Sequence, residues 1–151
     1  MSKRYSVTGP TEASVGPKTA VTVIGTAACR PFVYDVMVGV TTTPADYSVD
    51  VRVRPFTAAG TTAGTPPVGT PLDGNDQAAI CTCGWTLSAE PTVDEKVNYL
   101  RVVMNQRATF RWVAAPGGEL APAMATTKGV AVANFLAGAA VTLAATVHWF
   151  E

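Results

Sequence analysis

The sequence contains very little of what enzyme active sites are usually built from. Among its 151 residues there is one histidine, His148, and histidine is the usual base that activates a serine, threonine or cysteine nucleophile. His148 lies in the segment 146–150, where polar and apolar residues alternate as in a β-strand. A histidine on the face of a sheet is far more often a packed residue than a catalytic one. We therefore expect that this protein is not an enzyme.

Other catalytic and cofactor-binding patterns are missing as well. The glycine-rich stretch 60–64 lacks the lysine and the helix that a phosphate-binding loop requires. A glycosidase needs two carboxylates placed across its substrate, and the acidic residues that could pair lie in turns, where such residues are common. These are Asp94 with Glu95, and Glu90 with Glu119. We expect no catalytic residue and no cofactor.

Charge is scarce, and neither sign is in excess. Charged residues make up 15% of the chain, against about 25% in an average protein. The 11 Lys and Arg balance the 11 Asp and Glu, so no long-range field attracts nucleic acid or an acidic membrane. A surface with so little charge resists association weakly. It is typical either of a subunit that works in an assembly or of an ordinary domain with a threonine-rich face.

Long apolar runs are absent too. The most apolar late segment, 129–145, is interrupted by Asn134, Gly138 and Thr142 and is too short to span a bilayer. The basic residues near the start are followed by a polar segment instead of the apolar region of a secretory signal. We expect no membrane partner, and synthesis and folding in a cytoplasm.

Cysteine is limited to three residues, an odd number that does not form a disulfide framework. Cys81 and Cys83 could supply half of a zinc site, but a tetrahedral site needs four good ligands. Only Cys29 and His148 remain to complete it. We expect buried or half-buried free thiols and no metal.

The sequence is rich in short strands. From Val49 to Val53 every second residue is valine and the residues between are charged, so one face of this strand meets water or a polar partner. In the segment 31–41 we expect Phe32, Tyr34 and the valines at 36, 38 and 40 on one face. The expected strands are 19–25, 31–41, 48–56, 84–89, 96–105, 107–115, 128–135 and 140–150.

The segment 107–120 combines a strand with a turn. Phe110 and Trp112 alternate with Arg111, which places the two rings toward the core and Arg111 outward. Pro116-Gly117 then supplies turn geometry, because proline presets φ and glycine accepts positive φ. We interpret Arg111 and the turn at Pro116 and Gly117 as candidate partner contacts.

The connections between strands are expected to be short, with one exception. A tight hairpin is expected at Asn105-Gln106, and one helical turn within 73–80. The segment 57–74, rich in glycine, proline and threonine, is interpreted as a loop of one domain, not as a linker between two. Trp85 is the aromatic residue least constrained by its neighbours and therefore a further candidate contact.

Residues 1–18 contain two Gly-Pro pairs, Gly9-Pro10 and Gly16-Pro17, and we interpret them as an extended N-terminal arm that contains turns and is free to lie on a neighbour. Candidate contacts in the arm are Lys3, Arg4 and Tyr5. Residues 19–151 then form a single domain. About eight short antiparallel strands separated by turn residues, with little helix, predict an all-β fold, a jelly roll or β-sandwich.

Several features follow the arm in a recognisable order. They are the strand 20–24, the strand 36–42, the charged strand 49–54, the loop that ends in Pro71-Leu-Asp73, the segment 110–119 and the segment 147–151. Together they resemble the small jelly-roll virion proteins of tailed bacteriophages known as capsid decoration, or cement, proteins. The resemblance covers most of the chain, and the chain departs from it at Cys81-Thr-Cys83 and in the turn 93–96.

The resemblance implies a structural protein of the virion. Copies, as homotrimers, would sit on the outer surface of the assembled head, across junctions between subunits of the major capsid protein. Two other functions stay open. A component of the tail or of the head-tail connector would be present in a ring or at a single site, and a lectin-like receptor-binding module would expose Trp85.

Overall fold

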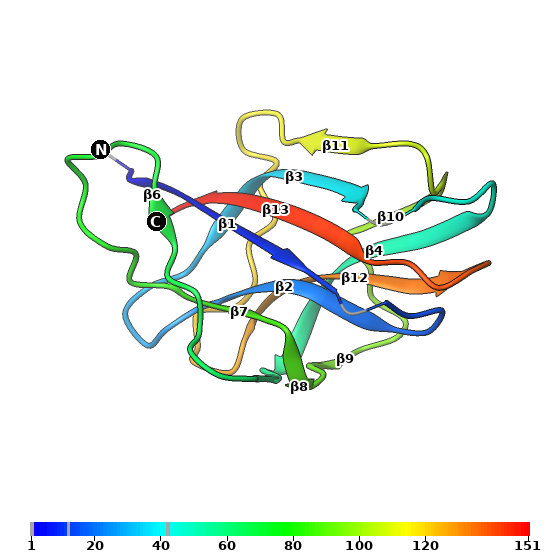
Figure 1. Cartoon of the computed structure of the whole chain (residues 1–151). Coiled ribbons are helices and arrows are strands. Elements are labelled where there is room, and N and C mark those ends of the chain that lie inside the picture. The colour runs from blue at the N-terminus through cyan, green and yellow to red at the C-terminus, as the bar shows by residue number, and fades with distance from the viewer. Residues whose placement is uncertain (1, 12, 42) are drawn as a thin grey trace.

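The computed structural model describes residues 2–11, 13–41 and 43–151, and within them two antiparallel β-sheets face each other as a sandwich (Figure 1). The all-β fold expected from the alternating pattern is confirmed, and no described residue is helical. None of these residues therefore belongs to a helix long and apolar enough to cross a membrane. The five-stranded sheet has the order β11 (Phe110–Val113), β3 (Phe32–Val40), β13 (Leu143–Phe150), β1 (Arg4–Pro10) and β6 (Thr70–Pro71).

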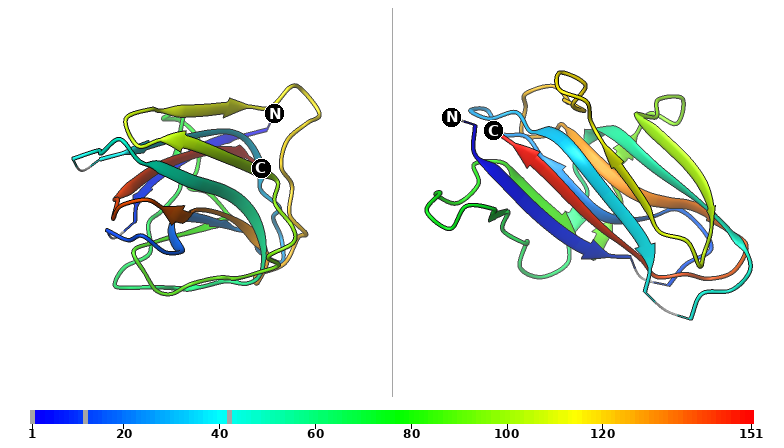
Figure 2. Two further views of the ribbon diagram at one scale, coloured as in Figure 1. Left: turned by 90° about the vertical axis from the view of Figure 1, so that its right-hand side faces the viewer. Right: turned by 90° about the horizontal axis from the view of Figure 1, so that it is seen from above.

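The second sheet has six strands and forms the other layer, and Figure 2 shows the two layers from the side and from above. A separate two-stranded ribbon joins β5 (Thr61–Thr62) to β8 (Leu87–Ala89). The six-stranded sheet has the order β10 (Leu100–Asn105), β4 (Ser48–Ala58), β12 (Gly129–Ala137), β2 (Lys18–Ile24) and β7 (Thr82–Trp85), with β9 (Thr92–Val93) paired to the end of β4.

Valine fills much of the core between the sheets, as its β-branched shape favours on a pleated surface. Val49, Val51 and Val53 of β4 are at most 3% exposed, which confirms the alternation predicted for this strand. Trp149 of β13 is completely buried and Trp112 of β11 packs against the core. Both tryptophans are therefore structural, as expected.

The described residues of the segment 1–18 do not form the extended arm that was expected there. Instead, β1 pairs with β13 along its whole length and with β6 on its other side. Tyr5 and Val7 point into the core and are 1% and 5% exposed. Gly9, which suggested a turn, is needed because a Cβ there would lie 2.5 Å from the carbonyl oxygen of Ala20. This glycine marks a close approach between two strands and not a flexible arm.

A β-bulge in β3 changes which of its residues face the core. The pairing of β3 with β13 shifts register between His148 and Trp149, which inserts Tyr34 as an extra residue. Phe32 and Tyr34 consequently stack on Phe150 outside the core, whereas the valines at 36 and 38 are buried. The expectation that these two rings share a face with the valines was wrong, because strict alternation does not survive a bulge.

The hairpin expected at Asn105-Gln106 does not form. Asn105 ends β10, and the next strand, β11, belongs to the other sheet. Gln106 is 2% exposed, and its amide accepts a hydrogen bond from the backbone of Ala45 and donates one to Ala139. A buried glutamine thus anchors a crossover between the sheets.

The helical turn expected within 73–80 is also absent. The carboxylate of Asp73 accepts a hydrogen bond from the backbone N–H of Asn75, and the carbonyl of Asp73 accepts one from Asp76. These two bonds close a β-turn. The aspartate side chain gives the backbone N–H of Asn75 a hydrogen-bond partner outside a helix, and the helical conformation is therefore not needed.

Eight strands carry the sandwich, namely β1 to β4 and β10 to β13. From β1 to β4 the chain changes sheet at every step, β4 and β10 are neighbours in one sheet, and the chain then alternates again to β13. The two halves of the sandwich are ordered β11-β3-β13-β1 and β10-β4-β12-β2. The long segment 59–99 lies between β4 and β10 and contains the short strands β5 to β9.

Candidate functional site

The residues selected from the sequence as candidate contacts do not come together in space. They lie at β1, β7 and β11, which are not neighbours in either sheet. Arg4 is exposed, and Lys3 and Trp85 are half-buried. Tyr5 was wrong as a contact, because it is 1% exposed and stacks on Trp149 with 5.7 Å between the ring centroids.

The strand and turn at β11 hold the other candidates. Arg111 is exposed and donates two hydrogen bonds, of 3.1 and 2.6 Å, to the buried carboxylate of Asp35. The Nδ1 atom of His148 lies 3.3 Å from the same carboxylate. Pro116 and Gly117 form the expected turn, which is exposed and in which Gly117 has a φ of 83°. Arg111 is therefore paired with Asp35 within the protein. The turn at Pro116 and Gly117 takes no part in this group of charged side chains.

The outer side of the six-stranded sheet carries a denser group of polar and aromatic side chains. Because the valines of β4 face the core, the charged residues between them face outward, as the sequence predicted. Strands β10 and β12 flank β4 and add residues in register with them. We call this surface the arginine face, and it consists of Asp50, Arg52, Arg54, Arg101, Val103, Phe135 and Leu136.

Asp50 is the anionic centre of the arginine face. Its side chain is 8% exposed, and its two oxygens accept hydrogen bonds of 2.8 to 3.3 Å from Arg52 and Arg101. Burial by itself would raise the pKa of Asp50, but the two arginines outweigh it and hold the pKa below its usual value. The carboxylate is thus ionised and fully engaged.

Arg54 is the least satisfied cation of this surface. It is 5% exposed, and its Nε donates to the side-chain oxygen of Asn98 at 2.9 Å. Its guanidinium carbon lies 4.7 Å from the centre of the Phe135 ring, on which Arg52 also stacks at 3.3 Å. The Nη2 atom is buried and has no hydrogen-bond partner among the described residues. A donor left in this state costs about 1–3 kcal/mol, and burial lowers the pKa of Arg54.

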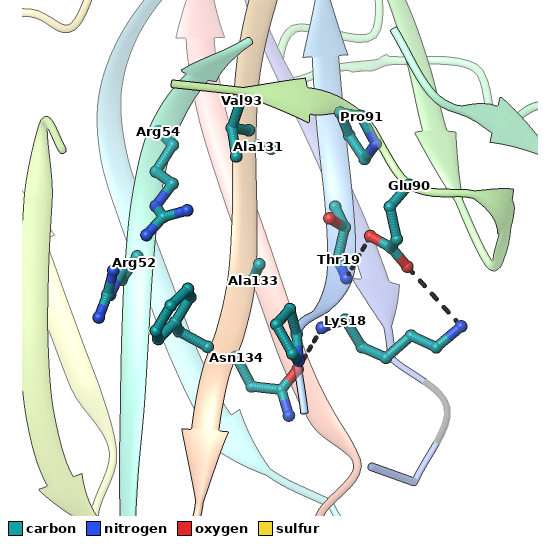
Figure 3. Close-up of a pocket in the computed structure, with 12 residues that line it drawn as sticks. Lys18, Thr19, Arg52, Arg54, Glu90, Pro91, Val93, Ala131, Ala133 and Asn134 are labelled. Atoms are coloured by element: carbon teal, nitrogen blue, oxygen red, sulfur yellow. Dashed lines mark hydrogen bonds and ion pairs between the residues drawn. The ribbon is translucent and has the colours of Figure 1, made fainter. Parts of the chain in front are cut away.

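A narrow pocket of about 70 Å³ opens beside this arginine. Figure 3 shows Arg52 and Arg54 of β4 on one side of it, and Lys18, Thr19 and Glu90 on the other. Glu90 accepts a hydrogen bond from the backbone of Thr19 at 3.0 Å and pairs with Lys18 at 3.7 Å. The pocket therefore has one cationic wall and one wall where the charges are already balanced.

The other end of the arginine face is apolar and exposed. Val103 and Leu136 both lie beside Asp50 on neighbouring strands and are 59% and 63% exposed. Tyr47 is 54% exposed and packs against the backbone of Gly138. Arginine and aromatic residues are enriched at the centre of protein–protein interfaces, and an exposed apolar patch beside them is a common mark of an interaction site. The surface is suited to binding another protein.

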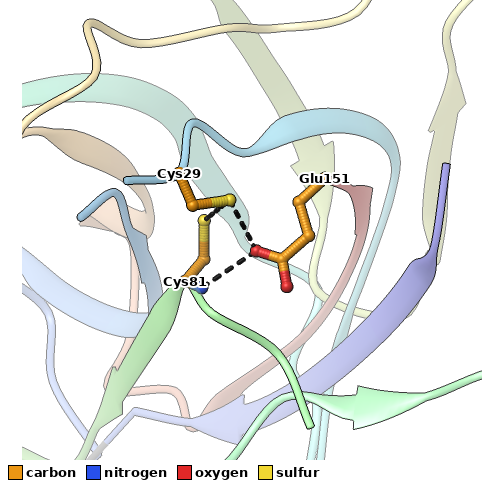
Figure 4. A group of neighbouring side chains, drawn as sticks. All are labelled: Cys29, Cys81 and Glu151. Carbon is orange, nitrogen blue, oxygen red and sulfur yellow. Dashed lines mark hydrogen bonds between the residues drawn. The ribbon is translucent and has the colours of Figure 1, made fainter. Parts of the chain in front are cut away.

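A second cluster lies at the end of the sandwich where the chain ends (Figure 4). Cys29 comes from the loop after β2, Cys81 immediately precedes β7 and Glu151 follows β13. The Sγ atom of Cys29 is 2.8 Å from Oε2 of Glu151 and 3.3 Å from Sγ of Cys81. The three cysteines are free and buried, as expected. The grouping considered from the sequence was different, however, because Cys83 and His148 do not belong to this cluster.

Sequence reasoning missed four of the residues that matter in these sites. Arg101 and Val103 share the outer face of β10 and alternate with the more buried Leu100, Val102 and Met104, and this pattern was the available signal. Phe135 could be placed on the outside only after the bulge in β12 was known. Nothing in the sequence distinguishes Glu151 from the other acidic residues.

Comparisons of the chain with protein-family models, with curated protein sequences and with solved structures gave no match.

Proposed function

We propose that this protein is a capsid decoration protein, a structural protein of the virion that binds the outer surface of an assembled phage head and stabilises it. The observation that carries the proposal is the order of the eight main strands, β11-β3-β13-β1 facing β10-β4-β12-β2. Two four-stranded halves connected in this alternating way are typical of the jelly roll, an architecture used in viral capsid proteins and in lectins. The resemblance of the sequence to small jelly-roll virion proteins supports the same conclusion.

The arginine face supports contact with a protein lattice. Its centre combines the stacked Arg52, Arg54 and Phe135 with the exposed Val103 and Leu136. Arg52 and Arg101 bind the carboxylate of Asp50, and Arg54 brings a third guanidinium over Phe135, so the residues of the arginine face carry more positive than negative charge. The guanidinium that a carboxylate or a backbone carbonyl of a partner can reach is that of Arg101, whose side chain is 55% exposed. The partner that we propose is the major capsid protein.

The mechanism is mechanical. A ligand that binds only the assembled lattice stabilises that lattice by RT ln(1 + [L]/Kd), about 2.7 kcal/mol per site when its concentration is 100 times the Kd. Low surface charge weakens the repulsion between neighbouring copies, and homotrimers would multiply the contacts that each unit makes. Because a head offers many such sites, the total stabilisation free energy of the lattice is large.

A pair of matched substitutions tests the proposal. Val103→Glu places a charge on the arginine face, and Val113→Glu places the same charge on β11 of the other sheet, where Val113 is 55% exposed. Heads purified from the phage that carries the gene are stripped of their decoration, mixed with each variant and sedimented. We expect Val103→Glu to bind at least tenfold more weakly, a loss of about 1.4 kcal/mol, and Val113→Glu to bind like the unmodified protein.

Other results would contradict the proposal in distinct ways. If the unmodified protein does not bind heads at all, the decoration function is wrong. Recovery with tails or connectors at a few copies per particle favours the tail component, and binding to glycans that depends on Trp85 favours the lectin. If heads are bound but only Val113→Glu weakens the binding, the function stands and the five-stranded sheet is the contact surface.

A further inference from the structure

Cys29, Cys81 and Glu151 bring two sulfur ligands and one oxygen ligand to a single point. Their ligand atoms all lie within 4.8 Å of one another, although the three residues are far apart in the sequence. The two cysteines are 7% and 2% exposed. We propose that these three residues form a binding site for a thiophilic divalent cation of the zinc type, a site that does not depend on the function proposed above.

The spacing of the ligands suits such a cation after a small expansion. Zinc binds thiolate sulfur at about 2.3 Å and carboxylate oxygen at about 2.0–2.2 Å, so tetrahedral geometry would place the two sulfurs roughly 3.7 Å apart. In the structure the sulfurs of Cys29 and Cys81 are 3.3 Å apart. Binding would therefore require the two sulfurs to move apart by roughly 0.4 Å. The fourth position of a tetrahedral site would remain for a solvent molecule.

The protons that now hold the cluster together are those that a metal ion replaces. The thiol of Cys81 donates to Sγ of Cys29, and the thiol of Cys29 donates to Oε2 of Glu151. When the cation binds, both S–H bonds break, the two sulfur electron pairs and one carboxylate oxygen coordinate the ion, and two protons pass to solvent. The cluster carries a charge of −1 before and after, because two positive charges enter and two leave. The exchange therefore adds no net charge to a buried place.

The carboxylate is held in position by groups that metal binding does not disturb. Oε1 of Glu151 accepts the backbone N–H of Ile80 at 2.7 Å, and Oε2 accepts that of Cys81 at 2.9 Å. The backbone of Glu151 is in turn paired in both directions with Lys3. Hydrogen bonds of this kind to a ligating carboxylate orient it and raise metal affinity.

A disulfide between the same cysteines is the competing use of this cluster. A disulfide would join the two sulfurs, which lie 3.3 Å apart, and would leave the carboxylate of Glu151 outside the new bond. A cation would use all three groups, because a carboxylate oxygen of Glu151 lies 2.8 Å from the sulfur of Cys29. The presence of the third ligand is what favours the metal over the disulfide.

Cobalt(II) is the probe, because thiolate coordination gives it a charge-transfer absorption that oxygen ligands alone do not produce. Purified, reduced full-length protein is titrated with Co²⁺ and then with Zn²⁺, alongside Cys81→Ser, Glu151→Gln and the control Cys83→Ala. We expect one equivalent of Co²⁺ with thiolate charge transfer, displaced by Zn²⁺. The charge-transfer band should be reduced in Cys81→Ser and retained in Cys83→Ala. Glu151→Gln should bind Co²⁺ at least tenfold more weakly than the unmodified protein.

A thermal measurement covers the case in which a cysteine variant does not fold. Zinc at 100 times its Kd should raise the melting temperature of the unmodified protein by roughly 5–10 °C, and Glu151→Gln should lose most of this rise. The proposal is overturned if the unmodified protein gives no charge-transfer band and no thermal shift. It is also overturned if Glu151→Gln binds the metal as tightly as the unmodified protein, or if the protein, with both Zn²⁺ and dissolved oxygen as the oxidant present, forms the Cys29–Cys81 disulfide instead of binding the metal.

Discussion

Replacing Tyr5 by alanine tests whether the start of the chain is a core strand or an arm. The ring of Tyr5 is buried to 1% exposure and stacks on Trp149, the largest fully buried side chain. Its hydroxyl donates a hydrogen bond of 3.2 Å to the carbonyl of Gln77. An arm that lies free, or that is ordered only on a partner, would have none of these contacts.

The structure sets the size of the effect. Removing a buried aromatic side chain costs about 3–5 kcal/mol, and total stabilities of domains are about 5–15 kcal/mol. Taking about 4 kcal/mol and about 2–4 °C per kcal/mol for a chain of this length, the melting temperature should fall by roughly 8–16 °C. Deleting residues 2–10 removes Tyr5, Val7 and the strand that covers one edge of β13, so we expect the deletion variant not to fold.

Urea denaturation followed by circular dichroism measures this loss. The matched control is Thr8→Ala on the same strand, because Thr8 is exposed and makes only a surface hydrogen bond to Thr146. We expect the control to stay within about 0.5 kcal/mol of the unmodified protein. If Tyr5→Ala is equally mild, or if the protein without residues 2–10 keeps its β-sheet spectrum and cooperative melting, β1 is not part of the core and the arm interpretation is restored.

Two further changes test the packing of the sandwich. Asp50→Asn removes the charge that Arg52 and Arg101 share and should lower the free energy of unfolding by roughly 3–5 kcal/mol at neutral pH. Because the arginines lower the pKa of Asp50, this loss of stability should be complete above the unfolded-state pKa of about 3.9 and should vanish as the pH falls through the folded-state pKa. A loss that does not change with pH in urea titrations would contradict the pairing. Gly129→Ala should destabilise the protein by about 1–3 kcal/mol or more, because the new Cβ would lie 2.2 Å from the carbonyl oxygen of Val23. The control Gly74→Ala should be neutral, because no atom lies within 4 Å of its new Cβ. Equal melting temperatures for the two variants would contradict the close approach at Gly129.

The strands of this protein could be predicted where polar and apolar residues alternate without interruption. They were predicted less well where the same residues are compatible with two local structures. The valines of β4 and the rings of β11 take the faces that their spacing predicted. A bulge at Tyr34 leaves no clear mark in the sequence, because an extra apolar residue in an apolar strand looks like one more step of the alternation. The pair Gly9-Pro10 predicts a turn, but a glycine is equally suited to a place where two strands approach closely, and this is its role here.

The candidate sites depended on topology to a greater degree. The side chains of Cys29, Cys81 and Glu151 meet because β2 and β13 end, and β7 begins, at the same side of the sandwich, and no sequence spacing encodes this meeting. Likewise, Arg101 reaches Asp50 only because β10 pairs with β4 instead of with its sequence neighbour β11. Residue types could suggest the chemistry, but strand order decides which of them share a site.

The measurement that tests the proposed function most directly is a cryo-EM map of the virions to which the proposal assigns this protein. The proposed function predicts β-sandwich density in many copies on the outer surface of the head, with the arginine face, including Arg101 and Leu136, turned toward the major capsid protein. Density for this fold at only one vertex or along the tail, or a head surface without it, would contradict the proposed function.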